Sequence, residues 1–183
     1  MLILEYKITE QEFLDYNYYV TWQSPDRKQQ RLRYYIVNLA VYIIFTVACL
    51  YLIDNNAMST SSWIIGGCGM IGLLLVIKFR TRSIFDRRAR RLLNGPNAGN
   101  ILSQTTLTIN EQGLFGKTLI SEVKYNWSAF QKRIVVNNCC YLFISPIQAV
   151  VIPLRAIRTS EKQDFDKLLS QYLPLRADLE GIN

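Results

Sequence analysis

Two uncharged apolar segments decide the fold of this chain: residues 34–53, YYIVNLAVYIIFTVACLYLI, and residues 58–77, MSTSSWIIGGCGMIGLLLVI. Each would form a helix about 30 Å long, which is the thickness of the hydrocarbon core of a bilayer. The loop between them is polar. A buried helical hairpin in a soluble protein is the alternative, but so short a chain cannot surround two wholly apolar helices. The sequence therefore predicts a hairpin of two transmembrane helices within residues 34–79.

Basic residues flank this hairpin on its outer sides. Four precede it and seven follow it, whereas its loop has none: Arg27, Lys28, Arg31, Arg33, Lys78, Arg80, Arg82, Arg87, Arg88, Arg90 and Arg91. The positive-inside rule then predicts a multi-pass protein with both termini in the cytoplasm. A nucleic-acid binder would spread its basic residues over a folded face, so we expect no nucleic-acid partner.

Six of these arginines form the basic part of a predicted stalk and linker, residues 80–100. Apolar residues recur among them at helical spacing, so the second membrane helix is expected to continue as an amphipathic cytoplasmic helix. The candidates for contact with anionic lipid headgroups are Arg80, Arg82, Arg87, Arg88, Arg90 and Arg91. The alternative is that these charges only set the membrane topology.

Small residues follow one stripe of the second apolar segment. Ser62, Gly66 and Gly69 are spaced i, i+4 and i+7, and Gly72 lies close by. Small residues let helix backbones approach closely within lipid, so this stripe is a candidate packing surface. Its partner is either the first helix of the hairpin or a second copy of the chain.

The N-terminal region, residues 1–33, predicts a short strand at residues 2–8 and then a helix. Thr9 and Glu12 fit a capping box, in which the two side chains satisfy free backbone N–H groups at the start of a helix. Aromatic residues follow at helical spacing, and Pro25 ends the helix. This helix lies either in the membrane interface, which favours tyrosine and tryptophan, or against the domain that follows.

Residues 101–175 have the pattern of a small α+β domain, followed by a tail at residues 176–183. Short alternating segments separated by turns predict an antiparallel meander, and a helix capped by Ser160 and Gln163 follows. The six predicted strands are residues 105–110, 114–120, 122–128, 130–136, 139–144 and 148–153. This order resembles a pleckstrin-homology (PH)-like split barrel, in which a C-terminal helix caps one open end. That fold has seven strands, and the N-terminal strand is expected to supply the seventh.

The ordered set of these features resembles the YcxB-like family of small bacterial membrane proteins. The matching segments are Tyr6-x-Ile8-Thr9, the hairpin, Tyr125-x-Trp127-Ser128, Tyr141 to Ile144, and Ile152-Pro153-x-Arg155-Ala156. Leu154 and Ile157 stand where such proteins usually carry a basic and an aromatic residue. The resemblance implies a PH-like cytoplasmic domain attached to the bacterial inner membrane. It implies no activity and no catalytic residues.

The residue types exclude several kinds of chemistry. Without histidine, the chain has no Ser-His-Asp or Cys-His site and no His-rich metal site. Cys139 and Cys140 are adjacent in a predicted strand, so they point to opposite faces and are expected to be free thiols. Trp127 is expected to pack rather than to stack on a ligand. Arg155 and Arg158 are either solvated or contacts for an anionic headgroup. We therefore predict no catalytic residues, no cofactor and no metal.

Three functions are compatible with the sequence. The first is a non-enzymatic membrane-anchored binding or regulatory protein, whose PH-like domain contacts lipid or a protein partner. The second is an accessory or assembly subunit of a larger inner-membrane complex. The third is an enzyme with an unrecognised site. The expected partners are the bilayer, anionic lipid headgroups, and a protein partner or a second copy.

Overall fold

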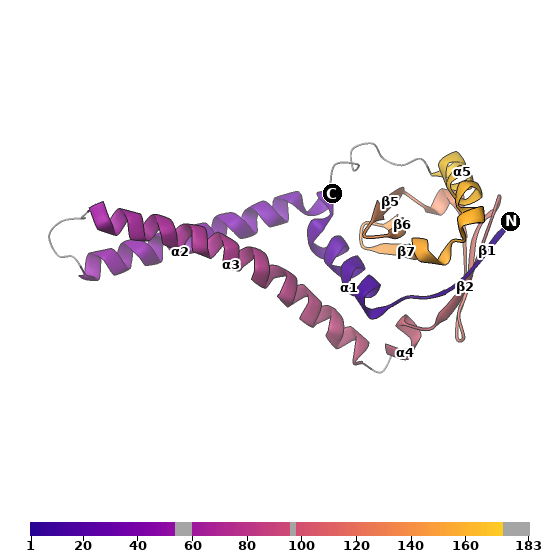
Figure 1. Ribbon diagram of the computed structural model, residues 1–183, viewed down its shortest axis with the longest axis horizontal. Coiled ribbons are helices and arrows are strands. Elements are labelled where there is room, and N and C mark those ends of the chain that lie inside the picture. Colours follow the sequence, from indigo (N-terminus) through magenta and orange to yellow (C-terminus); the bar gives the residue numbers. More distant parts are fainter. Residues whose placement is uncertain (54–59, 96–97, 174–183) are drawn as a thin grey trace.

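The structure, a computed structural model, describes residues 1–53, 60–95 and 98–173. Two long helices, α2 (Lys28–Ile53) and α3 (Thr60–Leu93), lie side by side and project from a small globular part (Figure 1). The predicted loop around residues 54–59 and the predicted tail at residues 176–183 lie outside the described residues.

Helix α2 is apolar and is not covered by the rest of the protein. Among the described residues, one helical stretch, Pro25–Ala48, is long and apolar enough to cross a membrane, and none of its apolar window is buried inside the protein. Side chains such as Ile36, Val41, Ile44 and Phe45 are about half exposed or more. A core helix of a soluble protein would bury these side chains, so α2 is a candidate membrane helix.

Helix α3 continues without interruption from its apolar half into the basic stalk, as the spacing of Phe85, Ala89, Leu92 and Leu93 predicts. We use "the stalk" for residues 80–93 of α3. The helix ends before Gly95, and a short helix that the sequence did not predict, α4 (Ala98–Ile101), leads into the sheets.

The globular part contains two antiparallel sheets. The first has the order β1-β2-β3-β4, and the second has the order β5-β6-β7. The strands are β1 (Leu2–Lys7), β2 (Gln104–Asn110), β3 (Gly113–Lys117), β4 (Glu122–Asn126), β5 (Lys132–Val136), β6 (Cys139–Ser145) and β7 (Gln148–Pro153). Strand β1 pairs with β2, Leu4 lying opposite Leu107. The expectation that the N-terminal strand completes the C-terminal sheet is therefore confirmed.

The main core lies between the two sheets and helix α5 (Lys162–Tyr172). Alternate residues of β1, β2 and β6 point inward, and Phe165 and Leu169 of α5 are fully buried among them. Figure 1 shows α5 lying against the strands. The apolar spacing of this helix is therefore confirmed.

The start of α5 differs from the sequence prediction. Residues Thr159–Glu161 form a 3-10 turn (η5), Glu161 is the N-cap residue, and no side chain caps the helix. The predicted capping box of Ser160 and Gln163 is therefore wrong. Glu161 N–H donates to Arg158 O at 2.9 Å and closes the 3-10 turn, so Ser160 lies within this turn and not at the N-cap position of α5.

Turns also shorten two predicted strands. Strand β3 ends at Lys117, because Thr118 N–H donates to Ser121 O at 2.8 Å and closes a hairpin. Trp127 lies in a 3-10 turn, η3 (Trp127–Ala129), and not on the strand with Val123. Asn137 and Asn138, with φ of 50° and 58°, make the turn between β5 and β6.

A second apolar cluster lies on the other face of the β5-β6-β7 sheet. It is covered by α1 (Glu10–Tyr18) and a π-helical turn, η1 (Tyr19–Gln23), with Tyr19 packed against Tyr141 and Phe143. The capping box of Thr9 and Glu12 is confirmed. The structure thus shows the second of the two predicted placements of this aromatic helix, in which it packs against the domain. Two short 3-10 turns, η2 (Pro25–Arg27) and η4 (Leu154–Ala156), complete the described elements.

The two adjacent cysteines belong to different clusters. Cys140 lies in the main core and Cys139 in the cluster beneath α1. Both are buried free thiols, as the alternation of a strand predicts. Burial raises the pKa of each thiol to about 11.

Candidate functional site

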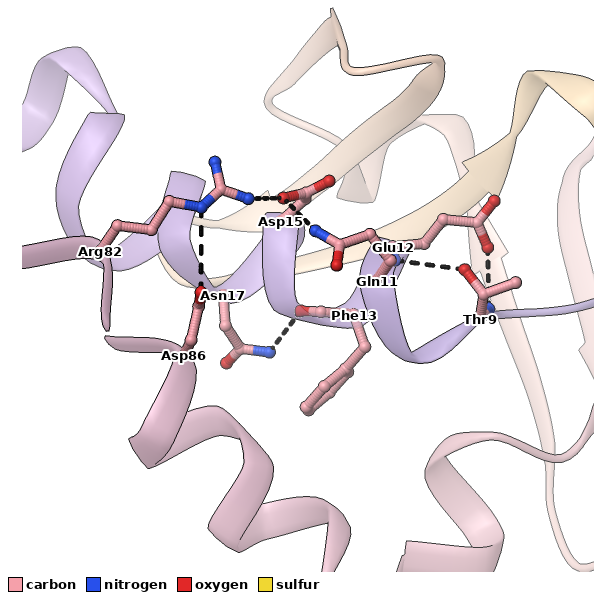
Figure 2. A network of polar contacts seen from close by, with 8 residues as sticks. All are labelled: Thr9, Gln11, Glu12, Phe13, Asp15, Asn17, Arg82 and Asp86. Atoms are coloured by element: carbon pink, nitrogen blue, oxygen red, sulfur yellow. Dashed lines mark hydrogen bonds and ion pairs between the residues drawn. The ribbon is translucent and has the colours of Figure 1, made fainter. Parts of the chain in front are cut away.

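Helix α1 lies at the junction between the stalk and the sheets, and its acidic side chains bind arginines on both sides. Asp15 pairs with Arg82 of the stalk at 2.6 Å, and Glu10 pairs with Arg90 of the stalk. Glu12 pairs with an arginine that follows the last strand. Figure 2 shows Asp15 and Arg82 meeting between α1 and α3, with Glu12 at the start of α1. The sequence did not predict these contacts.

Arg155 joins α1 to the globular part. Its Nε and Nη2 donate to the two carboxylate oxygens of Glu12 at 2.8 and 2.9 Å, and Nη2 also donates to Lys7 O at 2.7 Å. Thr9 N–H donates to the same carboxylate at 2.8 Å. We call the Arg155–Glu12 pair and the Lys7 contact the Arg155 clamp. The sequence left two roles open for Arg155, a solvated side chain or a contact for an anionic headgroup. The structure shows a third role, because the guanidinium is bound by Glu12 and by Lys7 O.

The clamp fixes the charge of its carboxylate. Burial acts to raise the pKa of Glu12, but the hydrogen bonds from Arg155 and Thr9 outweigh it and hold this pKa below its usual value. The hydrogen bond to Glu12 correspondingly raises the pKa of Arg155. Both groups are therefore ionised at neutral pH.

Aromatic rings surround the place where the stalk meets α1 and α2. Trp22 makes edge contacts with Tyr34 at 5.3 Å between ring centroids and packs against Phe85 at 5.5 Å. The guanidinium of Arg82 lies 5.3 Å from the centre of the Tyr18 ring. These contacts connect the π-helical turn η1 and the first turns of α2 to the stalk.

The six arginines predicted to contact lipid divide into two groups. Arg82 and Arg90 are engaged by α1. At 100° per residue, Arg80, Arg87 and Arg91 fall within about 40° of one another on the helix, and Ala89, which is buried, lies about 180° away. All three are exposed, and Arg88 is exposed beside them. We call Arg80, Arg87, Arg88 and Arg91 the outer arginine face.

The outer arginine face keeps its charge available. Within the part of the chain that the structure describes, no acidic side chain pairs with these four residues, and Arg87 only donates to Ser83 O of its own helix. Next to this face, the stalk and the end of α1 enclose an open groove of about 610 Å³. Its lining combines cationic and aromatic groups with one acid: Tyr18, Gln23, Arg82, Ser83, Asp86, Arg87 and Arg90.

One position of the predicted small-residue stripe, Gly69, lies against a side chain of α2. A side chain at Gly69 would collide with the hydroxyl of Tyr42, which reaches across from α2. A side chain at Gly72 would have no neighbouring atom within 4 Å of its Cβ. The side chains at positions 62 and 66 lie outside the described residues. At Gly69 the neighbour is therefore the first helix of the hairpin, and the role of the stripe in helix packing stays a prediction.

Trp127 is a packing residue, as expected. Its ring stacks on Tyr172 of α5 with centroids 4.9 Å apart, and its Nε1 donates to Asn110 O at 3.0 Å. The side chain of Arg158 is 82% exposed and lies 3.8 Å from the carboxylate of Glu161. Among the described residues, no three histidine, cysteine, aspartate or glutamate side chains gather as metal ligands would.

Comparisons with known proteins give one match. A family model described as YcxB-like protein matches residues 109–169, from the end of β2 into α5. The resemblance to the YcxB-like family is therefore confirmed for this segment. No curated protein and no solved structure matches the chain.

Proposed function

We propose that this protein is a non-enzymatic, membrane-anchored binding or regulatory protein of the bacterial cytoplasmic membrane. In this proposal α2 and the apolar half of α3 cross the bilayer as a hairpin, and both termini lie in the cytoplasm. The two sheets and α5 form a PH-like domain that is held close to the inner leaflet.

The observation that carries this proposal is the rigid connection from the apolar helices to the sheets. Helix α3 runs unbroken from the apolar segment into the stalk, and Arg82 and Arg90 fasten the stalk to α1. Helix α1 is fastened in turn to the sheets by the Arg155 clamp and by Tyr16, whose hydroxyl accepts from Ala149 N–H at 3.0 Å. A domain held in this way keeps one orientation toward the membrane surface.

The 4 + 3 arrangement of the strands supports the PH-like assignment. The chain order of the strands follows their order within each sheet, and a single helix packs against the main core after the last strand. A split barrel of this kind needs the strand β1, which the chain supplies from before the hairpin.

The ligand class that fits the junction best is an anionic phospholipid headgroup. The outer arginine face presents four guanidinium groups on the stalk, directly after the apolar half of α3. Arginine donates to phosphate oxygens in a planar, two-pronged geometry, and a juxtamembrane basic residue gains about 1 kcal/mol near an anionic leaflet.

The test compares two charge-matched triple variants of the full chain in nanodiscs. Replacing Arg80, Arg87 and Arg91 by glutamine removes three charges from the outer arginine face. Replacing three exposed basic residues of the globular part, Arg158, Lys162 and Lys167, by glutamine is the control. Retention of phosphatidylglycerol is measured by native mass spectrometry, with soluble glycerol phosphate as a competitor.

We expect the first variant to lose phosphatidylglycerol and the control to keep it. Equal retention by both variants would show that the headgroup is not held by this face. Displacement by soluble glycerol phosphate would indicate a site for a free phosphate compound instead of a lipid. A reporter fused after residue 183 tests the topology separately, because a periplasmic signal there would contradict the predicted orientation.

A further inference from the structure

Strand β4 is an open edge of the first sheet, and it carries an unusual set of exposed residues. In the part of the chain that the structure describes, β4 pairs with β3 alone. The hairpin tip before it exposes Leu119 by 86% and Ile120 by 65%, and Val123 within the strand is 42% exposed. An exposed edge strand with apolar neighbours is a template for pairing with another strand.

The hydrogen-bond pattern shows which backbone groups this edge offers. Thr118 N–H donates to Ser121 O, so these residues form a hydrogen-bonded pair, and the pairs alternate along the ladder from there. Val123 therefore bonds to Gly116 of β3, its partner in the register. The N–H and C=O groups of Glu122 and Lys124 consequently point toward the open edge.

We propose that a second copy of this chain pairs with β4 in antiparallel orientation, with Val123 of each copy at the twofold axis. In this register Glu122 of one copy lies opposite Lys124 of the other, twice, and both residues use their free backbone groups. If one copy slid by two residues along the other, Lys124 of one copy would lie opposite Lys124 of its partner. A slide in the other direction would place Glu122 of the two copies opposite each other. Like charges directly opposite destabilise a strand pair, so the charges select the register centred on Val123.

The same register places the exposed tip against a hollow. Ile120 lies three residues before Val123, and Asn126 lies three residues after it, so Ile120 of one copy comes beside Asn126 of the other. At this end of β4 the surface has a hollow of about 520 Å³, lined by Lys124, Tyr125, Asn126, Ser128 and Ala129. Each copy would therefore cover the apolar tip of its partner, and both tips are buried by one symmetric contact.

This interface is independent of the proposed lipid contact, because β4 and the outer arginine face share no residue. It extends the first sheet across both copies and joins two PH-like domains through their backbones. The occupant it selects is a copy of this chain, since the pairing of Glu122 with Lys124 is self-complementary.

Disulfide trapping in native membranes tests the register. In an antiparallel pair without hydrogen bonds the Cα atoms lie about 4.5 Å apart, which is within the range of a disulfide. We expect Val123→Cys to give a covalent dimer on oxidation with copper phenanthroline. Val135→Cys on the edge strand β5, with nearly the same exposure (40% against 42%), is the matched control. Equal trapping at both positions, or trapping of Val123→Cys to a different protein, would overturn the proposal.

Charge exchange tests the interface without a disulfide. Glu122 also pairs with Lys117 of its own sheet at 2.8 Å, and that ion pair is lost in any variant at position 122. We expect Glu122→Lys or Lys124→Glu alone to raise the dimer dissociation constant in detergent about tenfold, and the double exchange to recover the part of this loss that arises between the copies. Ile120→Asp should also weaken the dimer, whereas Ile147→Asp, at similar exposure (61% against 65%), should not. A chain that is monomeric under these conditions, or a dimer that tolerates both Glu122→Lys and Ile120→Asp, overturns the proposal.

Discussion

The Arg155 clamp makes a quantitative prediction about how α1 is held to the sheets. Arg155 donates to both oxygens of Glu12 and to Lys7 O, but its side chain is 52% exposed while that of Glu12 is 15% exposed. Water therefore screens one partner. We expect a coupling energy of about 1 kcal/mol between them, above a typical exposed pair and well below a fully buried one.

A double-mutant cycle isolates this energy. Glu12→Gln removes the charge but keeps a side chain that can bond to the Thr9 N–H, because glutamine also completes a capping box. Arg155→Gln removes the guanidinium and its bond to Lys7 O. The two single variants and the double variant are unfolded by urea in a non-ionic detergent. Unfolding is followed by tryptophan fluorescence in a background with Trp22 and Trp63 replaced by phenylalanine, so that Trp127, which stacks on Tyr172, reports the globular part.

Arg155→Gln should cost about 2 kcal/mol, because it breaks the ion pair and the backbone contact together. Arg158→Gln, at an exposed pair 3.8 Å long, should cost less than about 0.5 kcal/mol. A coupling energy of zero within error, or an equal loss for both arginines, would refute the role of the clamp.

Three further predictions follow from the core and from the ionisable groups. The pKa of Glu12 lies below its usual value of 4.5 in the folded protein, so the contribution of the clamp is complete above that pH and is lost as pH falls through the lower folded-state pKa. Urea midpoints from pH 7 to pH 3 should accordingly fall less for Glu12→Gln than for the unchanged protein. Phe165→Ala should destabilise the domain by about 3–5 kcal/mol in the same assay, since this side chain is 1% exposed in the main core; a loss under 1 kcal/mol would contradict the packing of α5. Cys139 and Cys140 should resist iodoacetamide at pH 8 in the folded protein and react in urea, because burial raises both pKa values to about 11; mass spectrometry of labelled peptides would show otherwise if either thiol were accessible.

Local patterns predicted the elements of this fold because each one depends on neighbours in sequence. The capping box of Thr9 and Glu12, the alternation that separates Cys139 from Cys140, and the spacing of Phe165 and Leu169 all follow from the period of one helix or strand. The capping box at Ser160 failed although it follows the same rule, because a 3-10 turn took the place of the first helical turn.

The candidate site was less predictable, because its contacts join distant parts of the chain. Six arginines look alike in sequence, but the packing of α1 engages Arg82 and leaves Arg80 exposed. The one indication of these contacts in the sequence is the pair of acids Glu12 and Asp15, three residues apart on one helix. Their spacing shows that both lie near one face, but it does not show that Arg155 and Arg82 reach them from opposite sides.

The pairing of β1 with β2 has a consequence for the order in which the protein is made. Lys7 lies opposite Gln104 in the finished sheet, and the whole hairpin lies between them in the sequence. At a synthesis rate of about 5–20 residues per second, β1 waits about 5–20 s for its partner to leave the ribosome. During that time the apolar segments of the hairpin emerge ahead of β2. Completion of the first sheet is therefore a late event in biogenesis, because β1 can pair with β2 only after the segments between them have been translated.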